Sequence, residues 1–243
     1  MKDYEKVDGI ATLRDWLLGS NYTVVLTGAG MSTESGIPDF RSSNGLWKRK
    51  DPMEVACVDA LLYDYENFYQ FYKARIENLM GCKPHRGYKI LAQWESEGLI
   101  NSIITQNVDG FHEMAGSTKV YKLHGTIHTI RCSQCSSPAS LNSFLQKEYC
   151  KKCEGHLRPN VVLFGETLPQ DELQIAIEEI ERAELVIVIG TSLMVYPVSQ
   201  LPFRANGRKV YINKEIPDHN LFDLNLKGMA GEILKEVDQI IEY

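Results

Sequence analysis

The sequence predicts an α/β fold: a doubly wound parallel sheet with helices on both faces and a smaller inserted module. Two patterns and one motif lead to this prediction. Short runs rich in β-branched residues are nearly continuous in apolar side chains, as expected of strands buried on both faces of a parallel sheet. Segments between them carry apolar residues at i, i+3 and i+4, the spacing of amphipathic helices. A glycine-rich turn follows the first apolar run, as it does in nucleotide-binding sheets.

Predicted strands and helices alternate, and the ligands of such sheets bind beyond the carboxyl ends of the strands. The predicted strands are residues 22–27, 101–105, 119–123, 184–189 and 208–213. We assign packing, and no chemistry, to three helical stripes: Phe68, Phe71, Tyr72, Ile76 and Leu79; Leu173, Ala176, Ile177 and Ile180; and Ile233, Val237, Ile240 and Ile241.

The chain is expected to form one domain, residues 1–243, in two parts. The segment between the first two predicted strands is far longer than one crossover helix, and a second interruption holds four of the six cysteines. We expect both insertions to leave the sheet on one side and form the smaller module. The Rossmann-like large part is then residues 9–41, 85–130 and 159–243. The module combines a helical insertion, 42–84, with the cysteine-bearing segment 131–158.

Composition narrows the class of protein. A chain of 243 residues with 44% hydrophobic content can bury one sizeable core. Its 26 basic and 32 acidic residues give a charge of −6, which argues against a nucleic-acid groove as the main site. The first ten residues lack an apolar signal region, and no run approaches the ~18 apolar residues that span a bilayer. We therefore expect a cytoplasmic protein with no membrane partner.

The cysteines form two C-x-x-C knuckles, and their spacing predicts a zinc ribbon. A two-residue spacer lets both thiolates of a knuckle reach one tetrahedral Zn²⁺ at ~2.3 Å. Disulfides are disfavoured in a reducing cytosol, and two tandem knuckles are hard to explain as redox motifs. Four thiolates leave no open position, so the zinc is expected to be structural. The predicted ligands are Cys132, Cys135, Cys150 and Cys153; Cys57 and Cys82 are interpreted as ordinary thiols, and His156 as a bystander.

The glycine turn departs from the dinucleotide-binding fingerprint. In TGAGMSTESGIPDFR, residues 27–41, Gly28 and Gly30 fit G-x-G-x-x-G, but Thr33 occupies the third glycine position. The next glycine, Gly36, leads into a polar, irregular segment where a dehydrogenase has a packed helix. The fingerprint of a dehydrogenase therefore does not explain the role of this polar segment in a nucleotide site.

Polar residues follow each predicted strand, so the same rim of the sheet is expected to collect them. His124 ends the third strand before Gly125, where a general base is useful, although a lone histidine there is more often structural. A metal pair with His128 would need a helix that Gly125 disfavours. Residues 105–110 have two interpretations. They form a plain turn, or their amide and carboxylate side chains bind ribose hydroxyls or a carboxamide group. His85 and His112 lie in capping or helical contexts.

Eight segments occur in the order and approximate spacing of the sirtuins, the NAD-dependent protein-lysine deacylases. They are GAGMSTESGIPDFR (28–41), TQNVDG (105–110), KLHG (122–125), the two cysteine knuckles, PNVVLFGE (159–166), GTSLMVYP (190–197) and YIN (211–213). The similarity runs from about residue 23 to the C-terminal helix, and the first segment is long and specific. The chain thus resembles a bacterial-type sirtuin, a transferase that deacetylates proteins.

The resemblance implies that the segment after the glycine turn is a cofactor loop that folds over the nicotinamide ribose of NAD. Phe40 would shield the anomeric carbon, Arg41 would bind phosphate, and Asp109 would take the carboxamide. Gln106 would hold a ribose hydroxyl, and the adenosine half would meet residues after the fourth and fifth strands. The implied NAD-binding residues are Gly28, Ala29, Thr33, Phe40, Arg41, Gln106, Val108, Asp109, His124, Thr191, Ser192, Asn213 and Ala230.

The family's mechanism is also implied. The carbonyl oxygen of the acyl-lysine attacks C1′ of the ribose as nicotinamide leaves. His124 then acts as general base so that the 2′ oxygen can attack. Asn107, the second implied catalytic residue, would line the nicotinamide pocket with Asp109. Water completes the reaction, giving free lysine, nicotinamide and 2′-O-acyl-ADP-ribose. The peptide is expected to pair as an added strand, with low sequence demand. The implied substrate contacts are Val162, Phe164, Gly165, Glu166 and Val195.

Alternatives stay open at this point: a long-chain deacylase, mono-ADP-ribosyl transfer as a side activity, or an NAD-binding regulator without turnover. We expect acetylated proteins as partners and a monomeric chain. Sirtuins that prefer succinyl or malonyl lysine carry a Tyr-x-x-Arg pair on the helix after the cofactor loop. An alignment anchored on residues 71–72 puts Ala74 and Ile76 there, which predicts a preference for acetyl; a slip of one residue would bring in Arg75.

Overall fold

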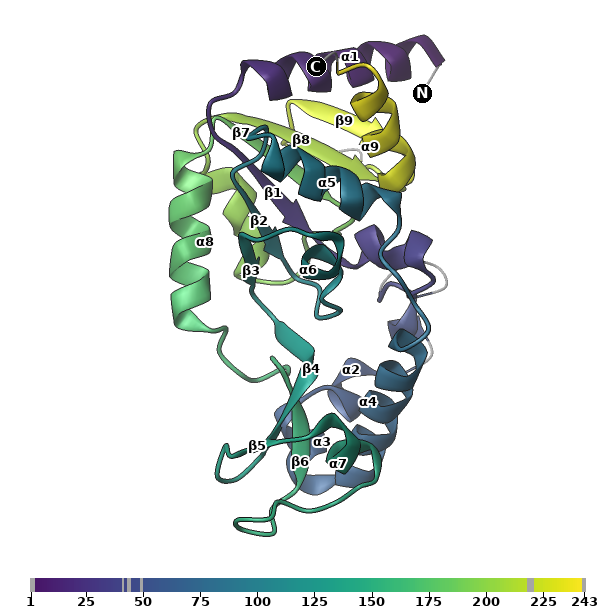
Figure 1. Ribbon diagram of the computed structural model, residues 1–243, viewed down its shortest axis with the longest axis vertical. Coiled ribbons are helices and arrows are strands. Elements are labelled where there is room, and N and C mark those ends of the chain that lie inside the picture. The colour runs from purple at the N-terminus through teal and green to yellow at the C-terminus, as the bar shows by residue number, and fades with distance from the viewer. Residues whose placement is uncertain (1–2, 41, 43–44, 49, 218–220, 242–243) are drawn as a thin grey trace.

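The computed structural model describes residues 3–40, 42, 45–48, 50–217 and 221–241. Its large part is built on a six-stranded sheet, and a smaller module with a three-stranded sheet extends from one end (Figure 1). No helix of the described residues is both long enough and apolar enough to cross a membrane.

The six strands of the large sheet are all parallel and follow the order β3-β2-β1-β7-β8-β9. They are β1 Thr23–Thr27, β2 Ser102–Thr105, β3 Val120–Lys122, β7 Leu185–Ile189, β8 Arg208–Asn213 and β9 Leu224–Lys227. The strand order reverses between β1 and β7, which is where doubly wound sheets bind ligands. The five predicted strands are confirmed. The sixth, β9, was not predicted, because its sequence LNLK mixes polar and apolar residues at the sheet edge.

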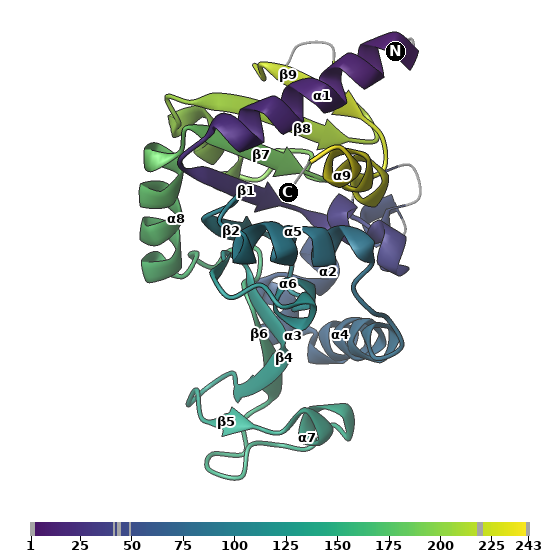
Figure 2. The same cartoon turned by 45° about the horizontal axis from the view of Figure 1, so that its top comes forward.

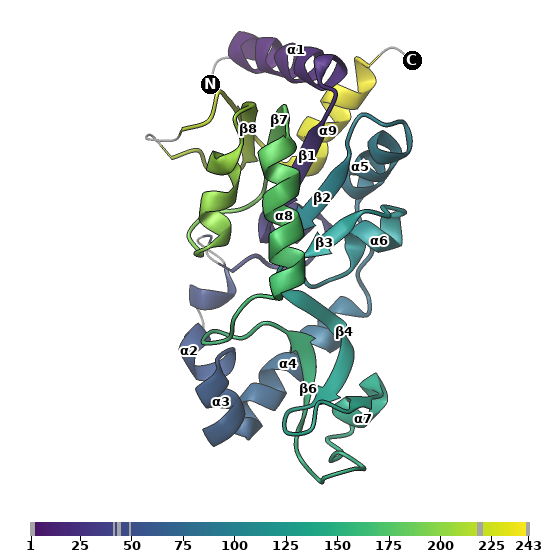
Figure 3. The ribbon, with the colours of Figure 1, turned by 90° about the vertical axis from the view of Figure 1, so that its left-hand side faces the viewer.

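Helices cover both faces of this sheet. α1 Asp3–Gly19, α5 Arg86–Ser96 and α9 Ala230–Gln239 pack on one face (Figure 2), and α8 Gln170–Arg182 packs on the other (Figure 3). The short helix α6 Phe111–Ala115 follows β2. Side chains of β1 point alternately to the two faces of the sheet. Val25 packs with the buried residues of α1, α5 and α9, while Val24 and Leu26 pack with those of α8. The predicted helical stripes of α8 and α9 are confirmed.

The smaller module joins the two insertions around a single apolar cluster. Its helices are α2 Pro52–Val55, α3 Val58–Tyr63, α4 Tyr65–Leu79 and α7 Leu141–Leu145, and its antiparallel strands are β4 Gly125–Cys132, β5 Pro138–Ala139 and β6 Leu157–Val161. Phe68 of α4 and Ile130 of β4 meet in this cluster, so segments far apart in the sequence stabilise each other. The predicted helix at α4 is confirmed.

Candidate functional site

A cleft of about 790 Å³ lies at the carboxyl ends of the parallel strands, where the large part meets the module. This volume is within the roughly 300–1,000 Å³ of typical ligand pockets. The predicted site residues that line it are Ala29, Phe40, Gln106, Asn107, Val108, Asp109, His124, Val162, Phe164, Gly165, Glu166, Thr191, Ser192, Val195 and Asn213. A second hollow, beside Lys48 and Asn67, contains none of them.

Three predicted residues lie outside this lining, and one lies outside the described residues. Gly28 directly precedes the lining residue Ala29, and Thr33 donates its hydroxyl to the Gly30 carbonyl at 3.0 Å. Ala230 is buried at the start of α9 and is not part of the lining. Arg41 falls outside the residues that the structure describes.

The glycine turn after β1 makes direct backbone contact with the turn after β7. The Gly30 N–H donates to the Gly190 carbonyl at 2.7 Å, and a Cβ on Gly30 would lie 2.7 Å from the Gly190 Cα. Gly190 itself has φ +63°, and a Cβ there would lie 2.3 Å from the Met31 nitrogen. Only glycine allows this approach. The chain then forms a short 3₁₀ helix, Ala29–Ser35, which Gly36 ends at φ 87°, in place of the long helix of a dehydrogenase.

Ser32 in this 3₁₀ helix organises a buried polar network around Asp109. The Ser32 hydroxyl donates to Asp109 Oδ2 at 2.7 Å and accepts from Asn107 Nδ2 at 3.0 Å. Since its only hydrogen goes to Asp109, the Tyr88 hydroxyl, 2.8 Å away, is the donor in their contact. Burial raises the pKa of Asp109. Sequence reasoning assigned no role to Ser32 or Tyr88, although Ser32 lies within the long motif.

His124 lies in the turn between β3 and β4, at the edge of the cleft. Its Nδ1 is 3.0 Å from the Gln106 carbonyl, which can only accept, so Nδ1 carries the proton and Nε2 carries the basic lone pair. Gly125 has φ +75°, and a Cβ there would lie 2.1 Å from the Asn160 carbonyl oxygen, so the sharp turn requires glycine. His128 Nε2 contacts the Asp109 carbonyl at 2.6 Å and forms no metal cluster with His124 among the described residues.

Thr191 connects the ends of β2, β7 and β8. Its hydroxyl accepts from Gln106 Nε2 at 2.9 Å, and its carbonyl accepts from the Tyr211 hydroxyl at 2.6 Å. Asn213 Nδ2 donates to the same tyrosine hydroxyl at 2.8 Å. The amide and hydroxyl groups predicted along the rim are therefore held in a shared network, with Tyr211 as a member that the sequence did not reveal.

The segment after β6 forms one wall of the cleft. Val162 donates its N–H to the His124 carbonyl at 2.9 Å, and Phe164 donates to Ala56 at 3.0 Å. Glu166 accepts from the buried Arg158 at 2.6 and 3.0 Å, and from the Leu163 N–H at 2.8 Å. Burial opposes the charge of Glu166, but these hydrogen bonds and the Arg158 charge lower its pKa overall. Its carboxylate therefore holds the wall in shape.

The expected acyl-pocket positions on α4 were wrong. Ala74 is exposed and Ile76 is buried in the core of the module, so neither lines the cleft. Tyr72 and Arg75 do line it, and the Arg75 guanidinium carbon lies 5.1 Å from the centre of the Phe40 ring. Residues three apart share a helix face, so the face that carries Tyr72 toward the cleft also carries Arg75. Among the described residues, Arg75 has no ion-pair partner.

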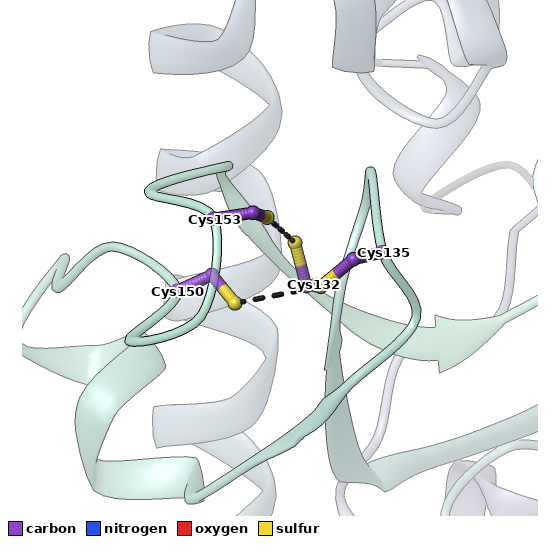
Figure 4. Close-up of side chains that lie close together, drawn as sticks. All are labelled: Cys132, Cys135, Cys150 and Cys153. Carbon is purple, nitrogen blue, oxygen red and sulfur yellow. Dashed lines mark hydrogen bonds between the residues drawn. The ribbon is translucent and has the colours of Figure 1, made fainter.

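The four knuckle cysteines bring their sulfurs to one point (Figure 4), and all four Sγ atoms lie within 4.8 Å of one another. Cys132 and Cys153 are 3.4 Å apart, and Cys135 and Cys150 are 3.7 Å apart. Sulfurs 2.3 Å from a tetrahedral zinc ion would be ~3.8 Å apart, so the donor set fits structural zinc. The His156 ring instead stacks on Tyr65, with ring centres 3.7 Å apart.

Comparison with known proteins gives consistent results. The model of the Sir2 family matches residues 28–197. An NAD-dependent protein deacetylase of Oceanobacillus iheyensis is 49% identical over 93% of this chain and 98% of its own length. A solved Sir2 structure with a deacetylated p53 peptide and 3′-O-acetyl ADP-ribose has a TM-score of 0.90 at 38% identity, covering 95% of this chain and 97% of that one. A Sir2–p53 peptide–NAD⁺ structure has a TM-score of 0.86 at 37% identity, covering 95% and 97%.

Proposed function

Because the chain belongs to the Sir2 family, the sirtuins that its motifs resemble, we propose that its cleft holds NAD and an acetylated lysine side by side. The chain is an NAD-dependent protein-lysine deacetylase, which converts NAD and acetyl-lysine to nicotinamide, 2′-O-acetyl-ADP-ribose and free lysine. The observation that carries the assignment of the base is the hydrogen bond from His124 Nδ1 to the Gln106 carbonyl, which leaves Nε2 as the proton acceptor.

The proposed NAD site follows the rim of the sheet. Thr191, Ser192 and Asn213 stand beside the adenosine half, at the ends of β7 and β8. The glycine turn after β1 faces the pyrophosphate, because Ala29 and Gly30 of this turn line the cleft. Asn107 and Asp109, both nearly buried, face the nicotinamide end. Roles for Arg41 and Ala230 remain expectations from the family resemblance.

In the proposed mechanism, each residue has one task. Asp109 accepts a hydrogen bond from the carboxamide and so holds nicotinamide until the glycosidic bond breaks. Phe40 excludes water from the anomeric carbon, and this prevents simple hydrolysis of NAD. His124 Nε2 then removes a proton from a ribose hydroxyl, so that the 2′ oxygen can attack the carbon derived from the acetyl group. The support for these tasks is the placement of all three side chains in one cleft.

The test is release of nicotinamide by the purified protein with acetylated and unacetylated forms of the same peptide. We expect release to require both NAD and the acetyl group. Transfer of ADP-ribose from NAD to a protein that carries no acetyl-lysine would favour mono-ADP-ribosyl transfer. NAD binding without any turnover would favour a regulatory protein. Equal nicotinamide release from both peptides would overturn the deacetylase mechanism.

A second substrate class is favoured by the positions of Tyr72 and Arg75. We propose that the same site also removes acidic acyl groups such as succinyl, because Arg75 offers a guanidinium in the cleft and the Tyr72 hydroxyl lies on the same helix face. A charge-assisted hydrogen bond contributes about 1.5–3 kcal/mol, which corresponds to roughly 10–150-fold in kcat/KM. This proposal replaces the preference that was expected from Ala74 and Ile76.

The ratio of kcat/KM for succinyl and acetyl forms of one peptide tests this second class. We expect Arg75→Met to lower the ratio at least tenfold and Arg182→Met, an exposed arginine on α8, to leave it unchanged. A ratio that is the same in wild type and Arg75→Met would remove the acidic-acyl proposal and leave deacetylation intact.

We also propose a monomer located in the cytoplasm and without a nucleic-acid partner. The net charge of −6 supports the lack of a nucleic-acid partner. Light scattering of the purified chain, alone and with duplex DNA, would test the oligomeric state and the lack of binding.

A further inference from the structure

The segment after β7 carries two large apolar side chains that are exposed at the mouth of the cleft. Met194 is 74% exposed and Tyr196 is 80% exposed, and both are part of the cleft lining. Val195 between them is half-buried. Burying such side chains is favourable, so two of them at the edge of a peptide-binding cleft indicate an interaction surface. We call Met194 and Tyr196 the apolar rim.

Both walls of the mouth also lack free charge. Residues 190–203 include no acidic, basic or histidine residue, in a chain with 24% charged residues. On the opposite wall, residues 161–170 include a single charged residue, Glu166, whose carboxylate is paired with Arg158. Along these two segments, a peptide would meet apolar side chains and backbone groups, and no unpaired charge that could select acidic or basic neighbours.

The geometry of the extended peptide decides which of its positions meet the apolar rim. Successive side chains of an extended chain point to opposite sides. Residues 194–196 of the enzyme include a bend and the start of a turn, with Met194 and Tyr196 exposed and Val195 half-buried between them. An acetyl-lysine that enters the cleft lies on the side of Val195. The residues directly before and after it then lie on the side of Met194 and Tyr196.

We propose that the apolar rim makes this enzyme prefer substrates with an apolar or aromatic residue directly before or after the acetyl-lysine. The inference rests on the proposed function, since it requires a peptide lying between residues 162–166 and 193–195. It adds a side-chain preference to a binding mode that depends mainly on backbone contacts.

The experiment uses three acetyl-lysine peptides that differ only in the two neighbours of the lysine: Leu, Gly or Asp. With the full chain and NAD, we expect kcat/KM for the Leu peptide to exceed that for the Gly peptide about tenfold, through added apolar burial. We expect the ratio to be insensitive to ionic strength, because the two side chains of the apolar rim are uncharged. The Asp peptide should not exceed the Gly peptide.

Two double variants make the test specific. Met194→Ser with Tyr196→Ser should bring the Leu-to-Gly ratio close to one. The matched control, Met114→Ser with Tyr63→Ser, removes side chains that are 58% and 83% exposed away from the cleft, and it should keep the wild-type ratio. A ratio cancels any general loss of activity, and circular-dichroism melting confirms that each variant folds.

A wild-type ratio near one, a ratio unchanged in the rim variant, or a salt-sensitive preference for Asp would each overturn the inference while leaving deacetylation in place. Failure of all three peptides to release nicotinamide in the wild type would overturn the proposed function, and this inference with it. The two failures are therefore distinguishable.

Discussion

At the scale of single residues, hydrogen-bond partners decide what each polar group in the cleft can do. The Gln106 carbonyl directs the basic lone pair of His124 to Nε2, and Ser32 keeps the Asp109 carboxylate hydrogen-bonded although it is buried. Both partners come from other segments of the chain. The chemistry therefore depends on contacts between motifs that lie far apart in the sequence.

Replacing His124 by Ala should lower deacetylation by ~10²–10⁴-fold, the usual contribution of a positioned general base. Exchange of labelled nicotinamide into NAD precedes the proposed base step, so it should fall much less. Calorimetric binding of NAD provides the control for an intact site. Parallel loss of both rates with unchanged NAD binding would show that His124 acts at an earlier step.

Asp109 should show a conflict between stability and activity. Burial raises its pKa above the unfolded value of 3.8, so the folded state binds a proton more tightly than the unfolded state. Stability is therefore lost as pH rises through the window above 3.8, and the ionised carboxylate is unfavourable at pH 7. Asp109→Asn should raise Tm at pH 7 by about 2–4 °C, or about 1 kcal/mol for a chain of this size, while slowing nicotinamide release.

Melting curves from pH 4 to pH 7 check this assignment. The gain in Tm for Asp109→Asn should narrow as pH falls toward 4, and exposed Asp15→Asn should show no such trend. A lower Tm for Asp109→Asn at pH 7 would mean that hydrogen bonds to the carboxylate outweigh the cost of burying it.

At the scale of elements, one buried ion pair connects β6 to the cleft wall. Arg158 is 3% exposed and Glu166 is 26% exposed, so loss of one partner leaves a buried charge without compensation. The pair also braces residues 161–166, because Arg158 Nη2 donates to the Val161 carbonyl and Glu166 accepts from Leu163. This ion pair therefore fixes the substrate wall to β6.

Glu166→Gln should destabilise the fold by about 3–5 kcal/mol, the typical cost of breaking a buried pair, and should raise KM for the peptide more than KM for NAD. The matched control is Glu181→Gln, whose partner Arg204 is exposed and which should cost no more than about 1 kcal/mol. Denaturant melts and separate KM measurements check both effects. Equal costs for the two variants would contradict the bracing role.

At the scale of the whole molecule, the cleft exists because the module packs beside the carboxyl ends of the sheet. The core of the module includes the predicted zinc ligands Cys132 and Cys150 together with side chains of α4, among them Tyr72, which with Arg75 also lines the cleft. Zinc, the module core and the acyl end of the cleft are therefore coupled, while the NAD side depends on the parallel sheet.

Cys150→Ser should release zinc and unfold the module, since structural zinc contributes ~10–16 kcal/mol of apparent binding free energy in peptides. Metal analysis should fall from one zinc per chain to none, and deacetylation should fall with it. Cys82→Ser, a thiol outside the cluster, should keep full zinc content. A zinc-free variant with unchanged melting and turnover would refute the structural role.

The sequence by itself determined the features that are encoded locally. Continuous apolar runs predicted the buried strands β1, β2, β7 and β8, and the knuckle spacing predicted the sulfur cluster, because both depend on residues within a few positions of each other. The rim at the strand ends followed from the parallel sheet alone.

Tertiary structure decided everything that depends on rotation or on distant partners. A helix pattern does not say which side chains reach a cleft: Ile76 packs into the module core and Ala74 is exposed, whereas Tyr72, from the same core, and Arg75 line the cleft. The contacts of Ser32 with Tyr88 and of Tyr211 with Thr191 join residues 56 and 20 positions apart. Such contacts arise only when the sheet has formed, because burial and long-range hydrogen bonds are properties of the folded chain.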